Sequence, residues 1–133
     1  MSVVWSMTTQ ESGRFSSNER SSEARELIDS FNALRSRGQG YVEVRLSGKE
    51  FPQLTLGFRG DKAVIHLFES EESVSLLVGD GVMSSSETLE VPIMDDVVSF
   101  SGDFVVGVDD GWEIVLRFIT TGTVENTREW CEL

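Results

Sequence analysis

The chain has 133 residues but only one cysteine, one histidine and two prolines. A single cysteine, Cys131, excludes an internal disulfide and any zinc site built from several cysteines. With His66 as the only histidine, the ligand sets of deaminases and zinc hydrolases cannot be assembled either. We therefore expect no metal, no cofactor and no enzymatic activity.

Long apolar runs are also absent. No stretch approaches the roughly 20 apolar residues that a membrane-spanning helix needs. The first residues, Met1 to Met7, lack the basic leader and continuous apolar segment of a signal peptide. We therefore expect a cytoplasmic protein that does not enter a membrane. A chain of this length can bury a core of its own, and we predict a single domain over residues 1–133.

Basic residues become scarce after Lys49. Residues 1–49 contain seven Lys or Arg and six Asp or Glu, whereas residues 50–133 contain four and seventeen, and the net charge is -12. An acidic body repels nucleic acid and anionic membranes and attracts basic partners. No basic face develops in the first part of the chain, so we expect no binding of nucleic acid. An acidic composition also serves solubility alone, and charge by itself does not separate the two interpretations.

Short runs of alternating apolar residues predict a sheet in the middle of the chain. Leu54–Arg59, Ala63–Phe68 and Val74–Val78 are separated by short turns, which is typical of antiparallel strands. The middle run is apolar on both faces, so both sides of that strand should be covered. Further strands are predicted at Tyr41–Leu46, Leu89–Ile93, Val97–Phe100 and Phe104–Val108. Pro92 lacks a backbone N–H and places its strand at a sheet edge or end.

Two segments have helical spacing instead. From about Arg20 to Arg37, apolar residues recur every three or four positions. Ser16 and Glu19 have the spacing of a capping box, with a helix start a few residues later as the alternative. A second helix is predicted from Asp110 to Gly122, with Asp110 and Glu113 as its capping box.

Together these elements predict an α+β fold, with an antiparallel sheet of about six strands and one helix in each terminal region of the sequence. Residues 1–18 are predicted to hold a short strand around Val3 to Met7 and a Ser- and Gly-rich linker from residue 11, or to be flexible. On the strand Tyr41–Leu46, Val42, Val44 and Leu46 should face the core, which leaves Tyr41 on a half-exposed face.

Carboxylates gather in the predicted turns between strands. None of these groups has the alternating spacing of a calcium-binding loop, so we interpret them as solvent-facing, with a magnesium or calcium site as the alternative. The residues that we predict to face a partner are Glu69, Glu71, Glu72, Asp80, Asp95 and Asp96.

The remaining special side chains have two interpretations each. His66 lies in an apolar run and is interpreted as structural, with a general base or metal ligand as the alternative. Trp112 and Trp130 are interpreted as core residues, with interface anchors as the alternative.

Several segments together resemble a known family. They are Phe51–Asp61, Leu76–Gly81, Phe100–Val105, Trp112 and Glu129–Leu133. These segments, spread over Tyr41 to Leu133, resemble an actinobacterial immunity-protein family, the first catalogued among those of bacterial polymorphic toxin systems. The resemblance implies a small α+β protein that binds a toxin encoded beside it, commonly a nuclease or deaminase, and blocks the toxin's site.

Three functions follow as hypotheses. The leading one is an immunity protein that inhibits a cognate toxin with a basic cleft through an acidic surface. The alternative is a non-catalytic regulatory or scaffold module that pairs with another protein or with itself through a sheet edge. A small-molecule-binding or hydrolytic domain would need a deep pocket near His66. The sequence leaves the oligomeric state open.

Overall fold

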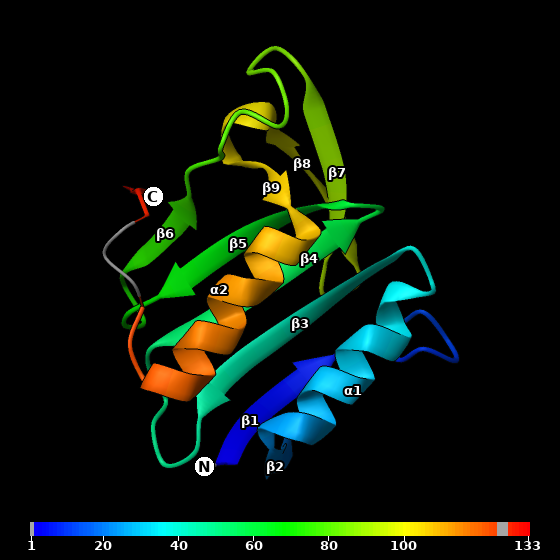
Figure 1. Cartoon of the computed structure of the whole chain (residues 1–133), viewed down its shortest axis with the longest axis vertical. Coiled ribbons are helices and arrows are strands. Elements are labelled where there is room, and N and C mark those ends of the chain that lie inside the picture. Colours follow the sequence, from blue (N-terminus) through cyan, green and yellow to red (C-terminus); the bar gives the residue numbers. More distant parts are fainter. Residues whose placement is uncertain (1, 125–127) are drawn as a thin grey trace.

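The computed structural model describes residues 2–124 and 128–133 and has an α+β fold (Figure 1). Its strands are β1 (Ser2–Met7), β2 (Arg20–Glu23), β3 (Gln39–Leu46), β4 (Gln53–Arg59), β5 (Lys62–Phe68), β6 (Val74–Leu77), β7 (Thr88–Ile93), β8 (Asp96–Ser101), β9 (Val106–Gly107) and β10 (Trp130–Glu132). Its helices are α1 (Ala24–Arg35), α2 (Val108–Thr121) and the short 3-10 helix η1 (Gly102–Phe104). No helix within the described residues is long and apolar enough to cross a membrane.

Within these described ranges, one sheet has the strand order β10-β6-β5-β4-β3-β1-β2, and β9 pairs with the start of β5. Every pairing is antiparallel, and the predicted meander of β4, β5 and β6 is confirmed. The predicted antiparallel sheet is confirmed, and the strand predicted at Phe104–Val108 is present as the two-residue β9. The strands β2 and β10 were not predicted because four and three residues are too few to show alternation. The two remaining strands, β7 and β8, form a separate hairpin.

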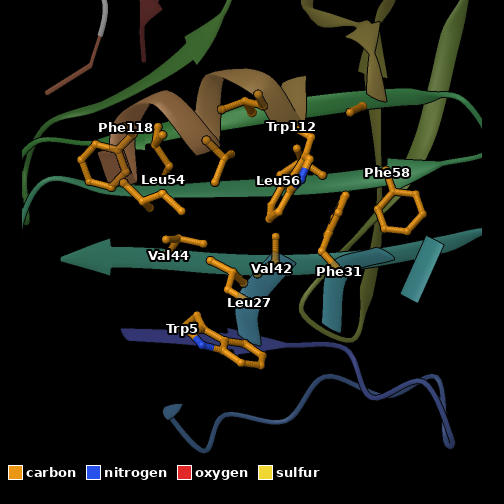
Figure 2. Packing of buried hydrophobic residues seen from close by; sticks show 14 of the residues in the cluster. Trp5, Leu27, Phe31, Val42, Val44, Leu54, Leu56, Phe58, Trp112 and Phe118 are labelled. Carbon is orange, nitrogen blue, oxygen red and sulfur yellow. The ribbon is translucent and has the colours of Figure 1, made fainter. Parts of the chain in front are cut away.

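Both helices cover the same face of the large sheet (Figure 1). Alternate apolar residues of the central strands point to that face, and Figure 2 shows them beneath the helices. Phe31 of α1 stacks on Trp112 of α2 with ring centroids 3.9 Å apart, so the two helices contact each other as well as the sheet. Trp112 is 7% exposed, which confirms its interpretation as a core residue.

The β7–β8 hairpin covers the opposite face, where β7 crosses β3 and β4. Val64 of β5 is buried there against Val91 of β7, so both sides of β5 are covered, as predicted. Gly57 of β4 allows this close approach, because a Cβ atom at that position would lie 2.6 Å from the carbonyl oxygen of Pro92. The edge position predicted for Pro92 is confirmed, since among residues 2–124 and 128–133 the strand β7 pairs with β8 alone.

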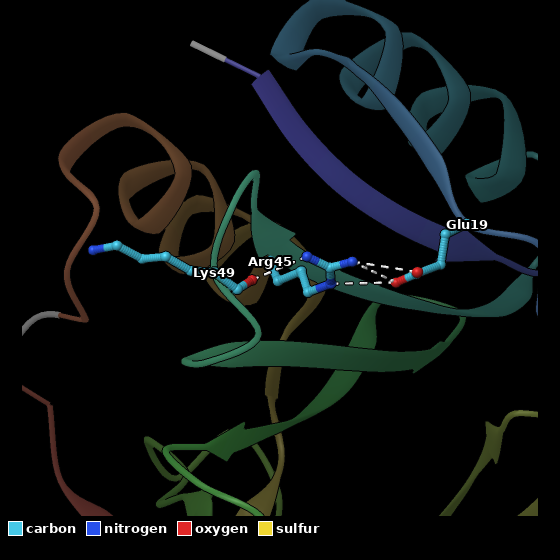
Figure 3. Close-up of polar contacts among 3 residues, drawn as sticks. All are labelled: Glu19, Arg45 and Lys49. Carbon is cyan, nitrogen blue, oxygen red and sulfur yellow. Dashed lines mark hydrogen bonds and ion pairs between the residues drawn. The ribbon is translucent and has the colours of Figure 1, made fainter.

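The first helix begins later than predicted. Residues 20–23 are the strand β2, which pairs with β1, and α1 begins at Ala24 without a side-chain cap. The capping box of Ser16 and Glu19 was therefore wrong. Tertiary contacts explain the difference, because the indole Nε1 of Trp5 donates a hydrogen bond to the Ser22 hydroxyl at 2.9 Å. Glu19 pairs instead with Arg45 of β3, at 3.1 Å, and Arg45 also donates to the carbonyl oxygen of Lys49 (Figure 3).

The second helix begins earlier than predicted. Its N-cap is Gly107, with no side-chain cap, because β9 pairs with β5 and directs the chain straight into α2. The capping box of Asp110 and Glu113 was therefore wrong. Asp110 still lies in the first turn, where its charge is favourable at the positive end of the helix dipole. Gly122 ends the helix in the left-handed conformation, as predicted.

Tyr41 is more buried than its half-exposed strand face predicted. The Ser- and Gly-rich segment folds over the sheet, with Thr8 bridged to Phe15, and the Phe15 ring packs edge-on against Tyr41 at 5.4 Å. Tyr41 is consequently 2% exposed. The C-terminal segment also packs back, because β10 pairs with β6 and places Trp130 against the core, which supports the core interpretation of Trp130.

Candidate functional site

The charge of the molecule is concentrated in one segment. Residues 69–103 contain nine Asp or Glu and no Lys or Arg, so this acidic segment carries nine of the twelve net negative charges. It runs from the β5–β6 turn through the β7–β8 hairpin to η1. All nine carboxylates belong to exposed residues: Glu69, Glu71, Glu72, Asp80, Glu87, Glu90, Asp95, Asp96 and Asp103.

The acidic segment has no internal compensation of its charge. None of its nine carboxylates forms an ion pair with another described residue. Ion pairs between described residues lie elsewhere and include Arg45–Glu19, Arg35–Asp109, Lys62–Asp61, Arg117–Glu113 and Arg128–Asp110. Exposed pairs such as these contribute little to stability, but they cancel the local field. The uncompensated carboxylates therefore set the sign of the potential over the hairpin side of the molecule.

The six residues predicted to face a partner are all exposed; five of them lie in three different turns, and Asp96 is the first residue of β8. Glu69, Glu71 and Glu72 occupy the β5–β6 turn. Asp80 follows β6 and accepts a hydrogen bond from the backbone N–H of Val82 at 3.3 Å, which orders its own loop.

Asp95 and Asp96 lie at the tip of the β7–β8 hairpin. Asp95 accepts a hydrogen bond from the backbone N–H of Phe15 at 2.8 Å, so one of its oxygens is already engaged within the molecule. No hydrogen bond or ion pair among the described residues joins the three turns to one another. The six residues therefore form no hydrogen-bonded cluster, and a partner that contacts all of them would have to cover an extended surface. Their role in binding a partner stays a prediction.

Sequence reasoning missed one feature of this surface, which is the exposure of apolar side chains on the hairpin. Val97, Val98 and Met94 are 61%, 36% and 49% exposed. Residues 97–100 were predicted as a strand, but an alternating pattern does not tell whether a second layer will cover it. The signal available in the sequence was the position of Asp95 and Asp96 directly before two valines, because charged turns flank strands that lie near solvent.

His66 lies in an aromatic environment. Its ring packs edge-on against Phe100 at 5.6 Å and alongside Phe68 at 6.2 Å, and burial lowers the pKa of the imidazole. Among residues 2–124 and 128–133, no group of three or more His, Cys, Asp or Glu is arranged to hold a metal ion. This setting favours the structural interpretation of His66.

Two cavities of the described structure open elsewhere than at His66. A cleft of about 390 Å³ opens between β1, α1 and the segment that joins β1 to β2, with Trp5 and Arg20 in its wall, and His66 does not line it. A second cavity, of about 10 Å³, lies beside Glu43 and Arg45 and has room for about one water molecule.

Glu43 of β3 is a carboxyl group whose surroundings shift its pKa. Burial raises its pKa, a hydrogen bond from the Tyr41 hydroxyl at 2.8 Å opposes that rise, and the nearby charge of Glu19 adds to it. Burial likewise raises the pKa of Tyr41 far above its usual range. The hydrogen bond between Tyr41 and Glu43 orders this face of the sheet, and the cavity beside Glu43 has room for about one water molecule.

A scan of the chain against known protein families matched none of them, and a search among characterised proteins found no relative. The resemblance to an immunity-protein family therefore stays a prediction.

Proposed function

We propose that this chain is an immunity protein that binds a cognate protein toxin and inhibits it through the acidic segment. The toxin would be an enzyme acting on nucleic acid, a nuclease or a deaminase, because such enzymes have basic clefts that receive phosphate. The observation that carries the proposal is the uncompensated charge of residues 69–103, nine exposed carboxylates without one Lys or Arg. Carboxylates can occupy positions where phosphates would bind, and their field speeds the encounter with a cationic surface.

The energetics of the fold agree with a binding role. Each exposed carboxylate near others of the same sign is mildly unfavourable for the isolated molecule, and no ion pair among the described residues relieves it. A cationic partner would remove that repulsion on binding. We therefore expect the charge of this segment to act mainly on the association rate and on its dependence on salt.

The test uses the toxin domain encoded by the adjacent gene, carrying an inactivating substitution, as the binding partner. We expect tight binding at 50 mM NaCl and an association rate about tenfold lower at 500 mM NaCl, because screening shortens the range of the field. Binding that ignores salt would remove the electrostatic part of the proposal. Absence of binding, or an active toxin that stays active in the presence of this chain, would remove the whole.

Charge-neutral variants locate the surface. The triple variant Glu69→Gln, Glu71→Gln, Glu72→Gln and the double variant Asp95→Asn, Asp96→Asn should each lower the association rate. The matched control neutralises two exposed acids of α1, Glu26→Gln and Asp29→Asn, and should change the rate less than twofold.

The alternative is a regulatory or scaffold module that acts by pairing with itself or with another protein. Light scattering of the purified chain separates the two functions. A stable homodimer that buries the acidic turns would favour the module, and a monomer that binds the toxin domain would favour the immunity protein.

A further inference from the structure

The outer edge of β8 has backbone N–H and C=O groups that pair with no other strand of the described structure. The hairpin loop consists of Met94 and Asp95, so Ile93 and Asp96 form the pair that closes it. Hydrogen-bonded and non-hydrogen-bonded pairs alternate along an antiparallel ladder. The Gly102 N–H donates a hydrogen bond of 2.9 Å to the Glu87 carbonyl. Because Glu87 and Gly102 lie an even number of positions from Ile93 and Asp96, the closing pair is also a hydrogen-bonded pair, and the pairs between them alternate from there.

It follows that Val97 and Ser99 occupy non-hydrogen-bonded positions opposite Pro92 and Glu90. Their N–H and C=O groups point away from β7. Within the described residues, β8 pairs with β7 alone, and neither residue makes a backbone hydrogen bond to another segment. Both residues are exposed, so these groups face solvent.

The two edges of the hairpin differ in how well they are protected against pairing with another strand. Edge strands are commonly blocked by proline, by lysine or by inward-pointing charge. On β7, Pro92 occupies an outward-facing position and removes the donor there. The outer edge of β8 has no comparable block, because β8 contains neither Pro nor Lys. It also exposes Val97 and Val98, which suit pairing with another strand.

The charges around β8 indicate which kind of strand could pair with its free edge. Asp95 and Asp96 lie at its start, Asp103 follows its end, and Glu90 lies opposite Ser99. A second copy of this chain would bring the same carboxylates against these. An extended segment with Lys or Arg beside its strand residues would meet opposite charge at both ends of β8.

We propose that the free edge of β8 is the docking site for an extended, basic segment of the partner protein, which adds to the hairpin as a third strand. This inference rests on the proposed binding of a cationic protein and specifies its contact. Backbone hydrogen bonds to Val97 and Ser99 give the segment its affinity, and the exposed valines of β8 together with the nearby carboxylates give it selectivity.

The experiment compares two substitutions at one residue. Ser99→Pro removes the outward N–H and leaves the bonds to β7 in place, whereas Ser99→Ala keeps the N–H and removes only the hydroxyl. With the toxin domain of the adjacent gene as the probe, we expect Ser99→Pro to weaken binding about tenfold or more and Ser99→Ala to weaken it less than twofold. Circular dichroism and thermal melting verify that both variants are folded.

Hydrogen exchange on the unmodified chain gives a second readout, which decides the matter if Ser99→Pro does not fold. The amide protons of Val97 and Ser99 should exchange about tenfold more slowly when the toxin domain is bound. Tight binding with unchanged exchange at both amides would overturn the docking edge and leave the proposed function standing. Absence of binding would overturn both, and a homodimer that Ser99→Pro dissociates would show that the edge receives a second copy.

Discussion

The two faces of the sheet are built differently. The helical face buries a cluster of 22 residues from the sheet, α1 and α2, and its charged residues form ion pairs such as Arg35–Asp109. On the hairpin face the fully buried cluster has four residues, Val64, Leu76, Val91 and Val105, and the surrounding carboxylates are uncompensated. Stability therefore resides mainly on the helical face, which leaves the hairpin side free to be shaped for a partner.

The largest effect should come from the core of the helical face. Phe31→Ala removes a fully buried ring that contacts both Trp112 and Phe58, and we expect the free energy of unfolding to fall by about 3–5 kcal/mol. Urea denaturation measures it. The matched truncation on the hairpin, Val98→Ala, should cost less than about 0.5 kcal/mol. Equal costs at the two sites would contradict the contrast between the faces.

A smaller effect should come from the contact between the layers. In Gly57→Ala the new methyl group would lie 2.6 Å from the Pro92 carbonyl oxygen, so the hairpin must shift. We expect a loss of about 1–3 kcal/mol. Hydrogen exchange should locate the loss, with faster exchange at the amides of Val91 and Val98 and little change in α1. If amide exchange became faster by the same factor throughout the chain, the hairpin and the helical layer would unfold as one unit.

The pH dependence of stability offers a weaker probe of the hairpin face. Burial lowers the pKa of folded His66, so the unfolded chain binds more protons as the pH falls below about 6.5. His66 should therefore reduce the free energy of unfolding as the pH falls from about 6.5 through its lowered pKa. Denaturant titrations of the wild type and His66→Gln between pH 7.5 and 5 should show a shallower decline in the variant. Parallel curves would mean that His66 titrates alike in both states.

The smallest effect should come from the acidic turn itself. Neutralising Glu69, Glu71 and Glu72 together with glutamine should change the free energy of unfolding by less than about 0.5 kcal/mol, because these side chains are exposed and form no ion pair with another described residue. Thermal melting at low salt measures it. A large loss would show that the turn is structural and would weaken its role as a binding surface.

Patterns of local spacing in the sequence were sufficient for much of the fold. The apolar stripe of α1, the alternation of β3 to β5 and the glycine that ends α2 depend on neighbours a few residues away, and a sequence displays them directly. The exposure of the six predicted carboxylates followed from their position in turns.

Other features depended on contacts between distant segments. Residues 20–23 became a strand because β1 offered an edge, α2 began at Val108 because β9 paired with β5, and Tyr41 was buried because Phe15 packed on it. The free edge of β8 belongs to the same class. The sequence by itself determined which segments form the central strands and the helices and where charge accumulates, since both follow from local composition. Only the tertiary structure decided which edge and which face remain uncovered, because covering depends on how layers pack and not on any one segment.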